Sequence, residues 1–389
     1  MPAATASSAD LRFMRKALAL ARRMLGRTSP NPAVGCVIVR GGRIVGQGAT
    51  ASGGRPHAEA VALARAGTRA RGATAYVSLE PCAHRGRTAP CARSLVEAGV
   101  RRVVAGCVDP YPPVRGRGLA ILREAGVEVL SGVLEEECRR LNAGFIARVT
   151  RGRPLTRLKL AMSIDGRIAA GSGDSQWISS PASRTLVHRW RREADAVMVG
   201  AGTVIADNPH LTCRVAGGRD PVRVIVDGRL RCSPRARVFI ERSAAPALLV
   251  TTLANVVRAR RRYGGARVEV IGCPVRKAHR GSKRASERVT EIDLQALMRE
   301  LGRRGWCNVL IEGGARLAGS ALDAGIVDRV AFFVAPIVIG AGTPTVEGLD
   351  FARVRDAIAL DNLSVRRLGG DLLMEADIAP RRRARARPA

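Results

Sequence analysis

The apolar positions of the first 150 residues follow two different periods. Residues 11–25 repeat apolar side chains every three to four positions, which predicts a helix that ends at Pro30-Asn31-Pro32. Short apolar runs bounded by turn residues predict strands instead. We expect strands at 34–39, 43–47, 74–79, 101–108 and 127–130, and further helices at 57–66, 89–99, 117–125 and 134–148. This alternation is typical of an α/β sheet whose faces are covered by helices.

A composition break at Arg151-Gly152-Arg153-Pro154 separates a second α/β series from the first. We therefore predict one domain over residues 1–150, another over 151–378, and a basic, disordered tail over 379–389. Ser180 and Pro181 have the residue types of a helix cap and a first helical position. We expect helices at 181–193, 293–302 and 315–324, and strands at 155–163, 195–199, 222–226, 247–251, 267–271, 307–311 and 328–339.

Length and composition exclude several classes of protein. The 389 residues are comfortable for two domains, and the apolar fraction of 46% is that of a globular protein. No apolar run approaches 18 residues, and the first ten residues lack the features of a secretory signal, so we expect a cytoplasmic protein without a membrane span. In that compartment the nine cysteines are not expected to form a disulfide framework.

The formal net charge of +32 raises the possibility of a nucleic-acid partner. The basic residues are nearly all arginines and are spread along the whole chain rather than gathered in one stripe. Aromatic residues make up only 3%, which leaves few platforms for stacking on bases. We therefore interpret the charge as a compositional preference for arginine, with locally basic loop or tail segments at 276–288 and 380–389.

One ordered set of residues has the pattern of a zinc site. It consists of His57-Ala58-Glu59, then Pro81-Cys82, then Cys91. One imidazole and two thiolates suit a tetrahedral Zn²⁺ whose fourth position is open for water, and Glu59 is then free to move protons. This is the pattern of zinc deaminases, which replace an amino group on a base. The alternative, a core histidine and two unrelated cysteines, is less compatible with the ordered set.

The loop between the two cysteines is longer than the general deaminase signature, which has two residues there. Here eight residues separate Cys82 from Cys91. Among them His84 and Arg87 could contact a phosphate or a pyrimidine, or could equally be solvated loop residues.

The segment Glu80–Cys91 closely resembles the bifunctional riboflavin-biosynthesis deaminase/reductase family, as do residues 31–39 and 72–79. The resemblance implies an N-terminal cytidine-deaminase-like domain with a three-layer α/β/α fold. It also implies a phosphoribosylated diaminopyrimidinone as substrate, held by Asn31, His84 and Arg87. Thr50 departs from the family, because relatives often have a histidine there that touches the substrate.

The second half contains a double glycine between a predicted strand and helix, at Glu312-Gly313-Gly314. Such a turn suits a phosphate, although it could equally be a packing turn, and it is not the Rossmann fingerprint. Together with Lys159, Asp165-Gly166, residues 175–177 and residues 207–214, it resembles the reductase domain of the same family.

That resemblance implies a dihydrofolate-reductase-like α/β domain that uses NADPH to reduce the ribosyl group to a ribityl group. It implies cofactor contacts from Ala161, Trp177, Thr203, Asp207, Gly314, Ala315, Arg316, Leu317, Ala318, Gly319 and Ser320. It implies substrate contacts from Ser175, Arg191, Leu211, Arg214 and Glu312, with arginines as natural partners of the phosphate. Lys159 and Asp207 are candidates for proton transfer, with structural salt bridges as the alternative.

The sequence therefore predicts a bifunctional hydrolase and oxidoreductase with Zn²⁺ and NADPH as cofactors and a small phosphorylated pyrimidine as substrate. We expect no nucleic-acid or membrane partner, and the resemblance implies a homo-oligomer, either a dimer or a tetramer. Two alternatives compete with this interpretation. One is a nucleic-acid-editing deaminase with a basic binding module, and the other is a deaminase whose second half is only a scaffold.

Overall fold

The computed structural model describes residues 5–84, 89–265, 267–276 and 291–380. Arg87, nearly all of the basic segment 276–288 and the tail from residue 381 lie outside the described residues. Contacts within the chain divide it into two units, Met1–Arg153 with Gly305–Cys307, and Pro154–Arg304 with Asn308–Ala389. None of the described helices is long and apolar enough to cross a membrane.

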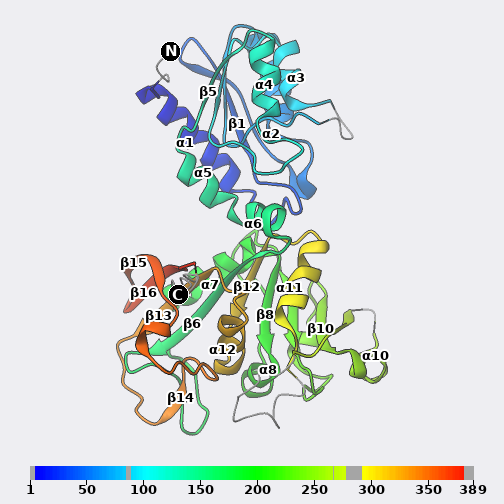
Figure 1. Ribbon diagram of the computed structural model, residues 1–389, viewed down its shortest axis with the longest axis vertical. Helices are drawn as coiled ribbons and strands as arrows, with labels where there is room; N and C mark the ends of the chain where they lie inside the picture. Colours follow the sequence, from blue (N-terminus) through cyan, green and yellow to red (C-terminus); the bar gives the residue numbers. More distant parts are fainter. Residues whose placement is uncertain (1–4, 85–88, 266, 277–290, 381–389) are drawn as a thin grey trace, which may run out of the picture. The chain divides into compact units, whose positions relative to one another are not determined.

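The first unit is a five-stranded sheet between two layers of helices (Figure 1). The strand order is β2-β1-β3-β4-β5, with β1 antiparallel to both neighbours and the last three strands parallel. Helices α1 and α5 lie on one face, and α2, α3 and α4 lie on the other. The strands are β1 (Gly35–Arg40), β2 (Arg43–Ala49), β3 (Thr74–Val77), β4 (Arg102–Ala105) and β5 (Glu128–Ser131). The helices are α1 (Ser8–Arg22), α2 (Ala58–Ala66), α3 (Cys91–Glu97), α4 (Arg117–Glu124), α5 (Glu135–Leu141) and α6 (Ala143–Arg151).

The second unit is built on a nine-stranded sheet in the order β11-β10-β9-β8-β12-β6-β13-β16-β15. All neighbours are parallel except the β13–β16 and β16–β15 pairs, which are antiparallel. Its long strands are β6 (Leu155–Ser163), β8 (Ala196–Gly200), β9 (Val222–Val226), β10 (Ala247–Thr252), β11 (Val268–Cys273), β12 (Asn308–Glu312), β13 (Arg329–Ala335), β15 (Leu360–Leu368) and β16 (Asp371–Ile378). The two-stranded sheet pairs β7 (Arg167–Ala170) with β14 (Gly342–Pro344).

Helices connect the parallel strands of the second unit, and their apolar sides form its core. Val187 and Trp190 of α7 pack with Val197, Ile225 and Phe333 from the sheet. The helices are α7 (Pro181–Glu193), α8 (Ala201–Asp207), α9 (Arg237–Ile240), α10 (Val256–Tyr263), α11 (Leu294–Arg303) and α12 (Ala315–Asp323). The two α/β units confirm the predicted fold class.

The predicted elements differ from the observed ones mainly at their ends. The helix predicted at 181–193 is confirmed, with Ser180 as its cap and Pro181 in its first turn, and the strand at 222–226 is confirmed. Two of the helix predictions were wrong. The first helix ends at Arg22 rather than at Pro30, because the chain then continues in turns through Gly26, whose φ of 74° is left-handed. The helix predicted at 134–148 is two helices separated at Asn142. Asn142 instead uses its side chain to bind the backbone of Ala33.

Asp10 ties α1 to the sheet of the first unit. Its carboxylate accepts hydrogen bonds from the Tyr76 hydroxyl on β3 (3.1 Å) and from Arg102 on β4 (2.7 Å), and it closes a capping box with Ser7. Burial alone would raise the pKa of Asp10, but the hydrogen bonds from Arg102 and Ser7 outweigh it and lower the pKa from 3.8 to about 2. The hydrogen bonds to the ionised carboxylate therefore stabilise the folded state, because the unfolded chain does not make them.

We expect Asp10→Asn to lower the free energy of unfolding of the first unit at pH 7 by about 1–3 kcal/mol, because a buried hydrogen bond to a charged group is lost. Since the folded pKa lies below the unfolded one, this contribution is present above pH 4 and is lost as the pH falls towards about 2. Hydrogen exchange of the β3 and β4 amides measures it. Glu128→Gln, at an exposed partner of Arg102, is the control. If the loss of free energy of unfolding in Asp10→Asn were the same at pH 7 and at pH 2, the ionised carboxylate would not be its source.

Candidate functional site

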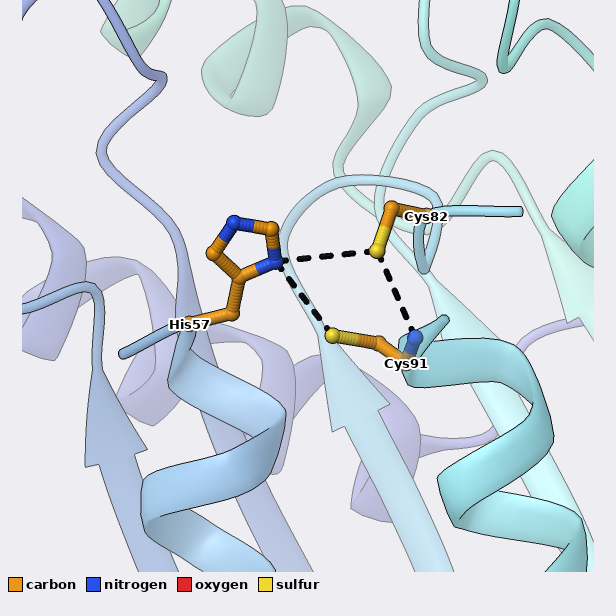
Figure 2. Close-up of side chains that lie close together, drawn as sticks. All are labelled: His57, Cys82 and Cys91. Carbon is orange, nitrogen blue, oxygen red and sulfur yellow. Dashed lines mark hydrogen bonds between the residues drawn. The ribbon is translucent and has the colours of Figure 1, made fainter. Parts of the chain in front are cut away.

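Three side chains from separate parts of the first unit converge at one point (Figure 2). His57 is the residue immediately before α2, Cys82 lies in the loop after β3, and Cys91 is the first residue of α3. His57 Nδ1 lies 3.3 Å from Cys91 Sγ and 3.6 Å from Cys82 Sγ. Their potential ligand atoms all lie within 4.8 Å of one another.

The geometry of this cluster fits a tetrahedral zinc ion. With metal–ligand distances of about 2.0–2.3 Å, two ligands of a tetrahedral Zn²⁺ lie about 3.6 Å apart, close to the separations observed here. Three ligands leave a fourth position for water. Cys91 at the start of α3 also points its backbone N–H at Cys82 Sγ (3.3 Å), which favours a thiolate there.

The electrostatics of the cluster favour negative charge on the sulfur of Cys82. Hydrogen bonding from Cys91 lowers the pKa of Cys82 to about 4, and the same contact raises the pKa of Cys91. The hydrogen bond to Cys82 raises the pKa of His57. Glu59 lies in the first turn of α2 and is 4% exposed, and its burial raises its pKa to about 7. A carboxyl group with that pKa can both take up and release a proton near neutral pH.

Three other residues discussed for this site have contacts of their own within the first unit. Asn31 donates from its side chain to the carbonyl of Gly54 (3.4 Å). Thr50 is buried, and its hydroxyl accepts the N–H of Val34 (3.1 Å), so this residue has a structural contact in place of a free side chain. His84 is exposed and makes an edge contact with Tyr111. Arg87 lies outside the described residues.

Glu80 is a residue beside the metal site that sequence reasoning did not single out. It is 3% exposed, and its two oxygens accept four backbone N–H groups. Oε2 binds Asp109 (3.1 Å) and Gly116 (2.9 Å), and Oε1 binds Gly118 (2.9 Å) and Leu119 (3.3 Å). This carboxylate therefore fixes the start of α4 and the preceding loop against the segment that carries Cys82. Its partners are about 30–40 residues away in sequence, so no local signal predicts them.

A second cluster forms at the centre of the larger sheet. Lys159 on β6 and Glu312 on β12 are cross-strand partners. Arg191 of α7 binds both oxygens of Glu312, with Nε–Oε1 at 2.6 Å and Nη2–Oε2 at 2.9 Å, and it also donates to the Thr212 carbonyl. Burial alone would raise the pKa of Glu312, but Arg191 outweighs it and lowers the pKa. Burial lowers the pKa of Lys159.

Asp207 at the end of α8 belongs to the same surroundings. It accepts a hydrogen bond from the Ser175 hydroxyl (3.2 Å), and the positive charge of Lys159 favours its ionised form. Burial nevertheless raises the pKa of Asp207. The structure thus brings together Lys159, Asp207 and Ser175 with the Arg191–Glu312 pair.

Trp177 is 68% exposed, and its ring is covered by the guanidinium of Arg184 at 4.4 Å.

The double glycine lies at the start of α12. Gly313 and Gly314 have φ values of 75° and 83°, which side chains disfavour, and a Cβ on Gly314 would lie 2.9 Å from the Thr203 hydroxyl. Of the residues predicted after it, Leu317, Ala318 and Gly319 are buried in the protein, whereas Arg316 is exposed and Ser320 is half-buried. The side chains of Leu317 and Ala318 are therefore not available to a ligand, whereas the first N–H groups of α12 have no partner within the helix.

The remaining predicted residues divide between core and surface. Ala161 packs against the apolar core of the second unit, and Leu211 is part of that core with a left-handed φ of 58°. Arg214 is exposed, and its backbone N–H and Nε each lie 3.2 Å from a ring nitrogen of His188. His188 was not predicted from the sequence. A half-buried histidine on a helix gives no local signal of what it contacts.

Two family models match the chain. The cytidine and deoxycytidylate deaminase zinc-binding region matches residues 7–107, and the RibD C-terminal domain matches residues 154–374. The chain is 40% identical to the riboflavin biosynthesis protein RibD of Actinobacillus pleuropneumoniae over 369 residues, which is 94% of each protein. It is 39% identical to that of Escherichia coli over 381 residues, covering 94% of this chain and 98% of the relative.

Solved structures show the same likeness. One is a diaminohydroxyphosphoribosylaminopyrimidine deaminase/5-amino-6-(5-phosphoribosylamino)uracil reductase from Thermotoga maritima, with a TM-score of 0.83 and 36% identity over 95% of this chain and 99% of that one. Another is RibD of Acinetobacter baumannii, with a TM-score of 0.82 and 36% identity over 96% of this chain and 99% of that one.

We expect Glu80→Gln to weaken the metal centre without changing any ligand. An amide has one acceptor oxygen, so two of the four backbone N–H groups would face an NH₂ group, at a cost of about 2–4 kcal/mol in the stability of the first unit. Loss of zinc to a chelator, followed by a colorimetric indicator, should become faster. Glu97→Gln, at an exposed position on α3, is the matched control, and equal zinc loss from both variants would contradict this role.

Proposed function

This chain belongs to the bifunctional deaminase/reductase family of riboflavin biosynthesis, and from that premise we propose how its own residues divide the two reactions. It is a zinc-dependent deaminase in its N-terminal domain and an NADPH-dependent reductase in its C-terminal domain. We assign residues 1–150 to the deaminase and 151–378 to the reductase. The observation that carries the proposal is the presence in one chain of the His57, Cys82 and Cys91 cluster and of the Lys159, Arg191 and Glu312 cluster.

For the deaminase we propose the substrate named for the Thermotoga maritima protein, a phosphoribosylamino-diaminopyrimidinone. His57, Cys82 and Cys91 would hold the zinc ion, which when bound activates water for attack on the ring carbon that carries the amino group. Glu59 has the position and the near-neutral pKa to take a proton from that water and pass it to the departing ammonia. Water adds and ammonia leaves, so no redox partner is needed for this step.

The deaminase substrate would be oriented by Asn31, His84 and Arg87. Asn31 donates to the carbonyl of Gly54 and His84 makes an edge contact with Tyr111, so a neighbouring group already contacts each side chain. Because Thr50 is buried and bonded to the backbone of Val34, these polar groups would have to provide the orientation that a histidine at position 50 provides in relatives.

For the reductase we propose that the deaminated product, a phosphoribosylaminouracil, is reduced to the ribityl compound. NADPH when bound supplies the hydride, which the opened sugar carbon receives. A proton must reach the ring oxygen as the sugar opens, and Lys159 is our first candidate donor, because burial lowers its pKa and eases release of the proton. Asp207 is the second, since burial raises its pKa.

The predicted binding residues fall into two groups. Trp177, Thr203, Asp207 and the backbone at Gly314, Ala315 and Arg316 would hold the cofactor, which the two glycines and the start of α12 support. Ser175, Glu312 and Arg214 would hold the substrate. Arg191 is already bound to Glu312, so we assign it to positioning that carboxylate and assign the phosphate to the exposed Arg214.

We also propose a cytoplasmic homo-oligomer. All nine cysteines are free thiols, as is usual in a reducing compartment. The outer strand β15 exposes Leu363 and Val365 by 58% and 53% beside an apolar hollow lined by Met162, Phe332 and Met374. Exposed apolar surface on an outer strand is a site where another copy can pack.

Two variants should separate the two activities. We expect Glu59→Gln to keep zinc and to lose deamination by about 10²–10⁴-fold, the usual contribution of a general acid–base group, while reduction of the deaminated compound continues. Lys159→Met should have the reverse effect. Ammonia release and NADPH oxidation, assayed separately on metal-replete protein, measure the two steps. Loss of both activities in either folded variant would contradict the division of labour.

Leu363→Asp combined with Val365→Asp should dissociate the oligomer. Two charges would be buried without partners at the interface, which is unfavourable by several kcal/mol. Light scattering after size exclusion should give the mass of a single chain for this variant and a multiple of it for the wild type. Val257→Asp, which changes an apolar residue 64% exposed on α10, should leave the mass unchanged. A wild type that is already monomeric would refute the proposal.

A further inference from the structure

His188 is a half-buried histidine of the second unit to which the proposed chemistry gives no role. It lies on α7, three residues before Arg191, so the two side chains project from neighbouring turns of one helix face. Arg191 holds the carboxylate of Glu312. His188 approaches a different group, the arginine to which we assign the substrate phosphate.

The contacts of α7 with the segment Thr212–Arg214 are continuous. Arg191 donates to the carbonyl of Thr212 at 2.9 Å, and the Cys213 thiol contacts the carbonyl of His188 at 3.4 Å. The imidazole then lies 3.2 Å from both the backbone nitrogen and the Nε of Arg214. A backbone and a side-chain nitrogen of the same residue are thus held against one ring, which restricts the rotamer of Arg214.

The protonation state of His188 suits this contact. Burial, together with the positive charges of Arg191 and Arg214, lowers the pKa of His188 to about 4. The ring is therefore neutral at physiological pH. The contact with the side chain uses the tautomer that carries its proton on Nδ1, because the lone pair of Nε2 then accepts from the Nε of Arg214 (3.2 Å). In that tautomer Nδ1 lies 3.2 Å from the backbone nitrogen of Arg214 without accepting from it. An imidazolium would have no lone pair and would repel both arginines.

We propose that His188 is a positioning residue that holds Arg214 in the orientation in which it binds the phosphate of the reductase substrate. This inference rests on the proposed assignment of the phosphate to Arg214. Arg214 is exposed, and a long exposed side chain loses rotamer entropy when it binds a ligand. A side chain already fixed by His188 has lost part of that freedom before the substrate arrives, which strengthens binding of the phosphorylated substrate.

The test compares KM and kcat of NADPH oxidation in the full chain with the phosphoribosylaminouracil and with its dephosphorylated analogue. His188→Phe keeps a flat ring but removes both nitrogens, and it should raise KM for the phosphorylated compound by about 10–100-fold, the range for a hydrogen bond to a charged group. kcat and the KM of the analogue should change little. His188→Gln, which keeps one donor and one acceptor, should recover part of the loss.

Arg214→Ala and the double variant identify which assignment fails. Arg214→Ala should raise KM at least as much as His188→Phe, and the double variant should be no worse than Arg214→Ala, because His188 acts only through Arg214. Arg189→Ala, at an exposed position on the same helix, controls for loss of charge. Unchanged NADPH affinity and unchanged deamination show that each variant is folded.

Three results would overturn the inference. If Arg214→Ala raises KM but His188→Phe does not, His188 has no positioning role, and the proposed function stands. If the two effects multiply in the double variant, His188 acts independently of Arg214. If neither Arg214→Ala nor removal of the phosphate changes KM, the assignment of the phosphate to Arg214 is itself wrong.

Discussion

A charge inside a folded chain must be matched at short range, because leaving it unpaired costs more than most single interactions contribute. Both functional regions of this protein are organised by that constraint. In the first unit, Glu80 is almost completely buried and accepts four backbone N–H groups. In the second, Glu312 is almost completely buried and is held by both arms of the Arg191 guanidinium. Neither carboxylate is among the groups we assign to proton transfer. Glu80 fixes the start of α4 against the segment that carries Cys82, and Glu312 lies opposite Lys159 on the neighbouring strand.

The groups that we assign to proton transfer are buried groups whose charge is only partly compensated by neighbouring charges and hydrogen bonds. Glu59 is buried next to the metal ligands, and its pKa is raised to about 7. Lys159 is buried beside Glu312 and Asp207, and its pKa is lowered although both carboxylates oppose the shift. Desolvation that is only partly compensated thus shifts the pKa of each group towards neutral pH, upwards for Glu59 and downwards for Lys159. In the second unit, the fully paired Glu312 and the partly compensated Lys159 are cross-strand neighbours.

The two units solve the problem of holding a ligand differently. The deaminase uses His57 before α2 together with Cys82 and Cys91, and the backbone N–H of Cys91 favours a thiolate at Cys82. The reductase uses glycines with positive φ at the start of α12, where the backbone can approach a phosphate closely. In the reductase, α7 contributes a further element. Its Arg191 and His188 contact two of the three residues that we assign to the substrate, so one helix orders both Glu312 and Arg214.

The sequence by itself determined the alternating α/β pattern, the bounds of α7 and the three candidate zinc ligands. These follow from local signals: periodicity, a Ser-Pro cap, and the spacing of His57, Cys82 and Cys91. It did not predict the break at Asn142, which depends on a contact with Ala33. It did not predict the outer strands either, because β16 depends on pairing with β13 and β15 on pairing with β16. Only the tertiary structure decided the partners of Glu80, the use of Arg191 by Glu312 and the contact of His188 with Arg214. Each of these interactions joins residues about 26–121 positions apart. The sequence around a charged or hydrogen-bonding group does not indicate which distant residue will be its partner.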